Sequence, residues 1–259
     1  MVRPTKPILQ NTVQILNPAG ASCVVLVCEH ASHFMPPEFS NLGLIGDPLT
    51  SHIAWDPGAR AVAERMSRAL DAKLVVSCVS RLIYDCNRPP TAPDAMPEKS
   101  EDTVIPGNQN LSGRDKDTRC EKYYRPFQRA LSGTVSQANH PVIITVHSFT
   151  PIYRDQHRAV EIGVLHDTDT RLADAMITSA SRHTDLNVER NQPYGPTDGV
   201  THTLTEHAIP GRHLNVMLEI RNDLIATVEQ QDAVATSLAA WLLDACAQLG
   251  AAETVQCTQ

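Results

Sequence analysis

The sequence predicts an α/β fold: one domain with a mixed, mostly parallel central sheet covered by helices on both faces. Short apolar runs rich in Val and Ile alternate with longer segments in which apolar residues recur at helical spacing. That alternation is typical of a sheet covered on both sides. The 259 residues, 42% of them hydrophobic, suffice for a large core. Since no repeat or low-complexity linker divides the chain, we expect a single domain over residues 1–259, with residues 1–20 as an N-terminal extension.

Five short apolar runs are the predicted strands. Runs of four to eight residues rich in β-branched side chains are typical of buried strands in parallel sheets. Here several of them end in polar residues. The expected strands are residues 23–28, 74–79, 141–146, 161–165 and 214–220.

Four segments with helical spacing lie between and after these strands. They are residues 57–71, 115–138, 169–184 and 232–249. The first opens with Asp56 and Pro57, an N-cap residue followed by a first-turn proline, and the last ends at Gly250. Residues 87–111 hold five prolines and no periodicity, so we expect a long loop there. Loops of this length are usually functional or disordered.

Composition and charge argue against several classes of protein. The net charge is −7 and the Lys and Arg residues are scattered, so nucleic acid is not an expected partner. No window approaches 18 consecutive apolar residues, and residues 1–17 lack the apolar region of a signal peptide, so we expect a cytoplasmic protein without a membrane span. The seven Cys residues form no CxxC pair, which favours thiols over a disulfide framework or a zinc knuckle. The sequence leaves open whether the protein forms a homo-oligomer.

Ionisable residues follow three of the predicted strands. In open α/β sheets, active groups gather at the carboxyl ends of the strands. The first strand leads into His30, the 141–146 strand leads into His147, and the last strand carries Glu219. Two imidazoles and one carboxylate, such as Asp56, would form a three-ligand zinc site with one position open for water. Because these residues come from separate segments, spacing alone leaves a structural role open for each histidine.

Six segments resemble the N-formylglutamate amidohydrolase family. In order along the chain they are residues 28–32 (CEHAS), 52–59 (HIAWDPGA), 80–89 (SRLIYDCNRP), 147–151 (HSFTP), 191–196 (NQPYGP) and 218–224 (LEIRNDL). The resemblance spans about residues 23–226. It implies a hydrolase that releases formate from N-formyl-L-glutamate in histidine degradation, on a fold similar to the zinc carboxypeptidases.

The resemblance also implies a Zn²⁺ site, or a site for another divalent metal. By the order of the zinc carboxypeptidase residues, His30 and His147 are metal ligands and Glu219 is the general base. The acidic ligand of those enzymes lies three residues after the first histidine, and this chain has His33 there. We therefore expect Asp56 as the third ligand. The alternatives for that ligand are Glu29, His33 and His52.

A substrate with two carboxylates requires cationic and polar side chains in the pocket, because guanidinium groups bind carboxylates through paired hydrogen bonds. The expected substrate-binding residues are Arg81, Asn87, Arg88, Tyr194, His207 and Arg221. Asp85 is placed to orient one of the arginines.

The chemistry of amide hydrolysis is consistent with this set of residues. Bound zinc lowers the pKa of its water to about 7, and a nearby carboxylate such as Glu219 can accept the proton. A serine hydrolase using Ser32 or Ser148 is less favoured, because the chain has no GxSxG motif. Two alternatives stay open: a deacylase or carboxypeptidase for another N-acylated acidic amino acid or peptide, and a non-catalytic protein that binds an acidic amino acid.

Overall fold

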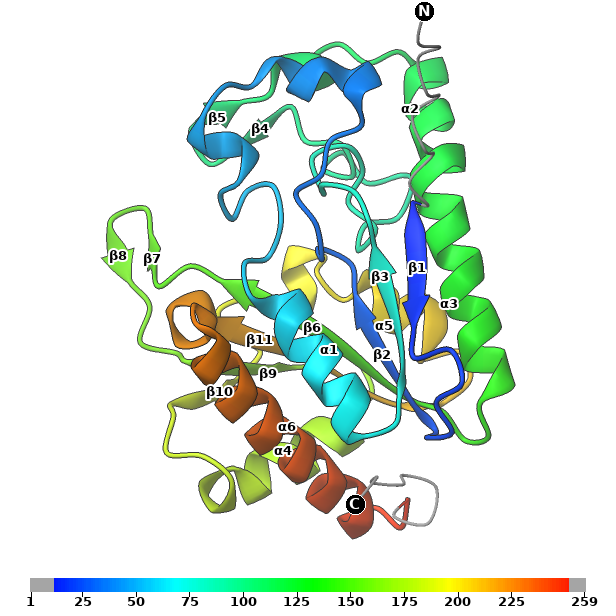
Figure 1. The fold of residues 1–259 in the computed structure, drawn as a ribbon, viewed down its shortest axis with the longest axis vertical. Helices are drawn as coiled ribbons and strands as arrows, with labels where there is room; N and C mark the ends of the chain where they lie inside the picture. The colour runs from blue at the N-terminus through cyan, green and yellow to red at the C-terminus, as the bar shows by residue number, and fades with distance from the viewer. Residues whose placement is uncertain (1–11, 252–259) are drawn as a thin grey trace, which may run out of the picture.

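A seven-stranded sheet forms the centre of the protein, in the order β1-β3-β2-β6-β11-β9-β10. The computed structural model describes residues 12–251, shown in Figure 1. The sheet strands are β1 (Val13–Leu16), β2 (Val24–Cys28), β3 (Lys73–Ser77), β6 (Val142–Phe149), β9 (Ile162–Leu165), β10 (Val188–Arg190) and β11 (Leu214–Arg221). Two small hairpins are β4 (Lys99–Ser100) with β5 (Thr103–Val104), and β7 (Ile152–Tyr153) with β8 (Gln156–His157).

The helices connect and cover these strands. They are α1 (Ala59–Ala69), α2 (Gly113–Arg119), α3 (Arg125–Gln137), α4 (Arg171–Ser179), α5 (His202–His207) and α6 (Val228–Gln248). A π-helical turn, Cys120–Tyr124, joins α2 to α3. Short 3-10 helices are Pro37–Gly43, Asp47–Leu49, Pro106–Asn108, Ala180–Arg182, Pro196–Asp198 and Asn222–Ile225. No helix within residues 12–251 is long and apolar enough to cross a membrane.

The sheet is mixed and mostly parallel, as predicted. Strands β3, β2, β6 and β11 run parallel, β1 is antiparallel to β3, and β9 is antiparallel to β11 but parallel to β10. The carboxyl ends of the four central strands therefore meet at one edge, where the loops after β2, β3 and β6 begin.

Alternate residues of each strand point to opposite faces and build two separate cores. Val24 and Leu26 of β2 pack with α1, α4 and α6, whereas Val25 and Val27 pack with the π-helical turn and α3. Figure 1 shows α1 and α6 in front of the sheet and α5 behind it. The predicted α/β fold with helices on both faces is confirmed.

Each of the five predicted strands and four predicted helical segments is present, with shifted ends. The 115–138 segment is interrupted by the π-helical turn just before Pro126, which lacks the N–H that a regular α-helical bond requires. Strands β1 and β10 and helix α5 were not predicted; each has six residues or fewer, too short for a clear period. Residues 13–16 of the expected N-terminal extension form β1, and residues 1–11 of it lie outside the described part.

Residues 87–111 form a long loop that contains β4, β5 and the 3-10 helix Pro106–Asn108. Buried polar contacts fix its course. The Asn108 amide donates to the carbonyls of Leu82 and Pro97, both at 2.9 Å, and Arg119 donates to Asn108 Oδ1 at 2.6 Å. The loop is therefore an ordered wall over the carboxyl end of the sheet.

The cysteines behave as the sequence predicted. No disulfide joins those between residues 12 and 251. Cys28, Cys86 and Cys246 are buried, and burial raises the pKa of each thiol. Cys257 lies outside the described residues.

Candidate active site

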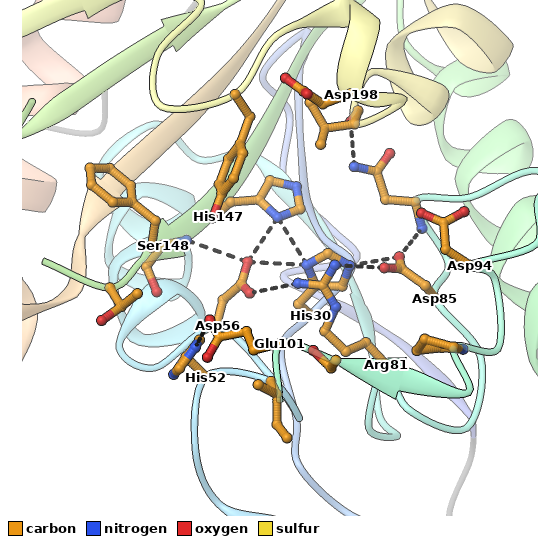
Figure 2. A pocket seen from close by; sticks show the side chains of 18 of the residues that line it. His30, His52, Asp56, Arg81, Asp85, Asp94, Glu101, His147, Ser148 and Asp198 are labelled. Atoms are coloured by element: carbon orange, nitrogen blue, oxygen red, sulfur yellow. Dashed lines mark hydrogen bonds and ion pairs between the residues drawn. The ribbon is translucent and has the colours of Figure 1, made fainter. Parts of the chain in front are cut away.

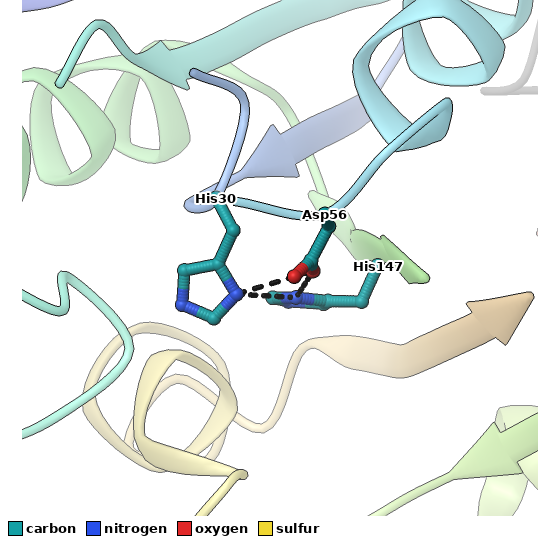
Figure 3. Close-up of side chains that lie close together, drawn as sticks. All are labelled: His30, Asp56 and His147. Carbon is teal, nitrogen blue, oxygen red and sulfur yellow. Dashed lines mark hydrogen bonds and ion pairs between the residues drawn. The ribbon is translucent and has the colours of Figure 1, made fainter. Parts of the chain in front are cut away.

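Three buried side chains converge at the carboxyl end of the sheet: His30 after β2, Asp56 before α1, and His147 within β6 (Figure 3). Asp56 Oδ2 lies 3.1 Å from His30 Nδ1 and 2.9 Å from His147 Nδ1, and the two Nδ1 atoms lie 3.2 Å apart. The metal cluster predicted from the strand ends thus brings its three expected residues together.

The local backbone explains how Asp56 reaches the two histidines. Its N–H donates to the His30 carbonyl at 3.0 Å, and the N–H of Ser148 donates to its Oδ2 at 3.3 Å. His147 projects to this side because Val146 faces the opposite core and side chains alternate along a strand. Glu219 is the register partner of His147 on the neighbouring strand β11, so its side chain shares this face.

Two further carboxylates hold the outer nitrogens of the histidines. Asp85 Oδ1 lies 2.7 Å from His30 Nε2, and Glu29 Oε2 lies 3.1 Å from His147 Nε2. All four side chains are at most 4% exposed. The Asp85 carboxylate can only accept, so His30 Nε2 carries the proton of this hydrogen bond, and Nδ1 of the neutral ring presents a lone pair to Asp56. The contact between Glu29 and His147 Nε2 is an ion pair without hydrogen-bond geometry.

This donor set fits a divalent cation. Without a bound cation, the lone pairs of the two rings and of the Asp56 oxygen would repel one another in a buried space. Only protons shared among these atoms would then relieve the repulsion. Burial opposes a charged His147, yet Glu29 and Asp56 raise its pKa well above the usual value, so the surroundings favour positive charge. Zinc ligands in a tetrahedron of about 2.0 to 2.1 Å radius lie about 3.3 Å apart, close to the separations observed.

Glu219 lies beside this cluster as a buried carboxyl group with an unused oxygen. Its side-chain Oε2 has no hydrogen-bond partner, and the residue is 5% exposed. Burial raises the pKa of Glu219 to about 7, partly offset by His147 and reinforced by Asp56. A carboxyl group with such a pKa can accept and release a proton near neutral pH.

A cavity of about 410 Å³ opens above these residues (Figure 2). His30, Asp56, His147 and Glu219 line it, and we call these four residues the pocket floor. Its walls come from the loops after β3 and β6 and from the segment before α5. Figure 2 shows His52 and Glu101 together on one side of the cavity and Asp198 on another.

Four of the six expected substrate-binding residues line this cavity: Arg81, Asn87, Arg88 and Tyr194. The arginines already have carboxylate partners, since Arg81 donates to Asp85 Oδ2 and Arg88 to Asp94 Oδ2, both at 2.7 Å. Each guanidinium keeps further N–H groups.

The Asn87 side chain holds the segment before α5. Its amide donates to the carbonyl of Val200 at 2.5 Å and accepts from the N–H of Thr203 at 3.0 Å. The structure thus gives Asn87 a backbone-binding role besides its place in the pocket wall.

The other two expected residues, Arg221 and His207, are not among the cavity-lining residues. Arg221 pairs with Glu161 at 3.1 Å and with Asp223 at 2.8 Å, because both carboxylates lie beside its guanidinium at the end of β11. His207 Nδ1 lies 3.3 Å from Ser132 Oγ of α3, in a separate depression. The short helix α5 turns its last residue toward α3 and away from the pocket.

The alternatives for the third ligand have other contacts. His33 packs against Trp55 with ring centres 4.8 Å apart, His52 pairs with Glu101 at 2.8 Å, and Glu29 contacts the outer nitrogen of His147. Asp56 alone of the four contributes an atom to the described cluster.

The serines do not form a nucleophile pair. The Ser148 hydroxyl donates to the carbonyl of Pro57, and Ser32 Oγ accepts from the N–H of Phe34. Neither hydrogen bond involves an imidazole, so the structure does not favour a serine hydrolase.

Sequence reasoning missed most of the upper pocket wall. Residues first recognised here in the structure are Phe149, Tyr153, Asp94, Lys99, Glu101 and Asp198. Phe149 ends β6, and the others lie in short hairpins, turns or a 3-10 helix, which are too short to show a period. The one available signal was the unusual length of the 87–111 loop.

Comparison with known proteins identifies the family of the chain. The family model of N-formylglutamate amidohydrolase matches residues 22–226. A gene product of Agrobacterium tumefaciens with a crystal structure is 48% identical, covering 93% of this chain and 97% of that chain, with a TM-score of 0.91. N-formylglutamate amidohydrolase from Ralstonia eutropha JMP134 is 19% identical, covering 95% of this chain and 98% of that chain, with a TM-score of 0.60, and shares the fold. No curated protein matches the chain. Because the matched family model spans most of the chain, from β2 to beyond β11, the protein belongs to the N-formylglutamate amidohydrolase family.

Proposed function

We propose that this protein is a metal-dependent amide hydrolase that releases formate from N-formyl-L-glutamate. The observation that carries the proposal is the buried cluster of His30, Asp56 and His147 with Glu219 beside it. Membership of the family supports an amidohydrolase. The same proposal places the reaction in histidine degradation, as the sequence resemblance implied, and in the cytoplasm, as expected from the N-terminal sequence and the hydropathy.

The three residues of the cluster would hold Zn²⁺ or another divalent cation. When bound, such a cation polarises the scissile carbonyl and lowers the pKa of a water molecule to about 7. Asp85 keeps the ring of His30 in the tautomer that presents Nδ1 to the cluster, and Glu29 places a negative charge beside the outer nitrogen of His147.

Glu219 is the proposed general base. Its free oxygen can accept a proton from the attacking water and pass that proton to the departing amine nitrogen, which leaves formate and the free amino acid. Transfers of this kind typically contribute about 10² to 10⁴ in rate. The buried setting of Glu219, with its pKa near 7, suits both halves of this step.

Arg81 and Arg88 are the proposed partners of the substrate carboxylates. The cavity lining contains six carboxylates but three Lys and Arg side chains. His30 and His147 also line the cavity, and the neighbouring carboxylates raise the pKa of both rings, so part of this negative charge is balanced within the pocket.

The proposal is tested by metal analysis of the purified protein, followed by measurement of formate release with and without a chelator. Stoichiometric divalent metal and chelator-sensitive release of formate are expected. A panel of N-formyl, N-acetyl and larger acyl derivatives of Glu and Asp then defines the substrate. Preference for a larger acyl group would indicate a related deacylase, and binding of an acidic amino acid without turnover would identify a binding protein.

A further inference from the structure

Arg158, which follows the hairpin of β7 and β8, lies among three aromatic side chains of the pocket wall. Its guanidinium carbon lies 4.6 Å from the ring centre of Tyr153, 4.9 Å from that of Tyr194 and 5.5 Å from that of Phe149. All three rings line the cavity. Neither the sequence nor the family membership assigns a role to this arginine.

The charge of Arg158 is not used in a salt bridge. Between residues 12 and 251 its guanidinium contacts the carbonyl of Thr150, at 3.4 Å, and the hydroxyl of Tyr194, at 3.0 Å, but no carboxylate. This differs from Arg81 and Arg88, which both have carboxylate partners. Aromatic faces attract a cation, so the position is tolerated without an ion pair.

The hydrogen bond between Arg158 and Tyr194 determines where the hydroxyl proton of Tyr194 can point. A guanidinium can only donate, so the Tyr194 oxygen must accept from Arg158 Nη2, and its own O–H proton is left for another acceptor. That hydroxyl donates to no other group in the described part of the chain. Since Tyr194 lines the cavity, an oxygen of a bound substrate can take the proton.

The segment that carries Tyr194 is fixed against the sheet. The N–H of Asn191 donates to the carbonyl of Val164 in β9 at 3.1 Å. A Cβ on Gly163 would lie 1.9 Å from the carbonyl oxygen of Gln192, so this close approach requires glycine. The backbone that carries the Tyr194 hydroxyl is therefore held in a fixed position.

The backbone of Arg158 is fixed as well. Its N–H donates to the carbonyl of Pro151 at 2.8 Å, and its own carbonyl accepts from Arg221 Nη1 at 3.2 Å. Arg221, expected from the sequence to bind substrate, thus holds the segment that carries Arg158.

The charged groups that face Tyr194 are Glu219, Arg158 and Arg81. Burial and Glu219 raise the pKa of the phenol above its usual value, and Arg158 and Arg81 lower it in part. The hydroxyl therefore keeps its proton at neutral pH and remains a donor.

We propose that Arg158 is a positioning residue that holds the Tyr194 hydroxyl with its proton directed into the pocket, toward the carbonyl oxygen of the substrate amide as that oxygen gains negative charge. This inference rests on the proposed hydrolase function. It concerns a contact that strengthens during the reaction, so it should affect kcat more than KM.

A double-mutant cycle tests this role with the metal-loaded protein. Arg158→Met, Tyr194→Phe and the double variant are compared for formate release. Arg158→Met should lower kcat about tenfold, as expected for one oriented hydrogen bond, and Arg158→Lys should restore part of it. In the Tyr194→Phe background Arg158→Met should have little further effect. An equal loss of kcat in both backgrounds would overturn the proposal.

Arg154 offers a matched control, because its guanidinium lies 5.3 Å from the Tyr153 ring and makes no contact with Tyr194. Arg154→Met should leave kcat unchanged. If it lowers kcat as much as Arg158→Met does, the hairpin as a whole is responsible and the specific role of Arg158 is refuted.

Fluorine NMR of protein containing 3-fluorotyrosine tests the contact without any substrate. The chain has five Tyr residues, and the Tyr194 signal is assigned by its loss in Tyr194→Phe. Arg158→Met should raise the pH at which the Tyr194 signal titrates, whereas Arg154→Met should not. An unmoved Tyr194 titration would contradict the proposal. If no acyl substrate is turned over but the titration moves, the hydrolase assignment fails while the positioning contact stands.

Discussion

The floor and the mouth of the pocket are built in different ways. The pocket floor consists of His30, Asp56, His147 and Glu219, which are all at most 5% exposed. Three of these residues lie in strands or at their immediate ends, and Asp56 precedes α1. The pocket mouth, by which we mean His52, Lys99, Glu101 and Asp198, comes from turns, the β4–β5 hairpin and a short 3-10 helix outside the central sheet. Its His52–Glu101 pair has side chains that are each 34% exposed.

This contrast separates two requirements of the proposed reaction. Groups that hold a cation and transfer a proton need fixed positions and low solvent access, which buried strand ends provide. Groups that contact the variable part of a substrate can lie on loops, because loops change without disturbing the sheet. We therefore expect substitutions in the floor to affect metal content and kcat, and substitutions in the mouth to affect KM.

The largest effect should come from His147→Ala. Loss of one imidazole leaves two ligands, and the buried Glu29 loses the ring nitrogen that it contacts at 3.1 Å. We expect stoichiometric metal to be lost and turnover to fall to background. Metal analysis by mass spectrometry and formate release measure the two effects. His52→Ala is the matched control at the mouth and should retain full metal, so equal metal loss in both variants would remove the distinction between floor and mouth.

Glu219→Gln should have the next largest effect. The amide keeps the shape of the side chain but cannot accept the proton, so kcat should fall by about 10² to 10⁴ while metal content stays normal. The pH profile gives a second measurement. A base must be unprotonated, so wild-type turnover should decline as the pH falls through the pKa of Glu219. That pKa is about 7 without metal and is lowered by a bound cation.

The acid limb of the profile should disappear in Glu219→Gln. A variant with nearly normal kcat and the same acid limb would show that another group accepts the proton. Asp85→Asn would not serve as a control, because Asp85 contacts His30 Nε2 at 2.7 Å.

The features that could be predicted from the sequence belong mainly to the pocket floor, and those that could not belong mainly to the pocket mouth and its loops. The central strands and the positions of His30, His147 and Glu219 could be predicted, because buried strands have a clear apolar pattern and active groups gather at their carboxyl ends. Asp56 was expected over Glu29, His33 and His52, and in the structure a hydrogen bond from its N–H to the carbonyl of His30 holds it beside the two histidines.

The expected residues that do not line the pocket lie where local sequence carries little information. Arg221 and His207 were expected in the pocket because they follow or precede strands, but the direction of each side chain depends on distant partners, Glu161 and Ser132. The π-helical turn and the contacts of Arg158 likewise depend on tertiary packing. No spacing rule in a single sequence shows which residues of two separate loops meet.

The smallest effect should come from Glu101→Gln at the mouth. Glu101 pairs with His52 at 2.8 Å, and an exposed pair of this kind contributes about 0 to 1 kcal/mol to stability. The thermal unfolding midpoint should therefore change little, as calorimetry can measure. The substitution also removes one negative charge from a cavity rich in carboxylates, so KM for a dicarboxylate substrate should fall a few-fold at low salt and kcat should stay constant. Because salt screens exposed charges, the decrease in KM should become smaller as ionic strength rises. A change in kcat or metal content instead would show that the pocket mouth also affects the pocket floor.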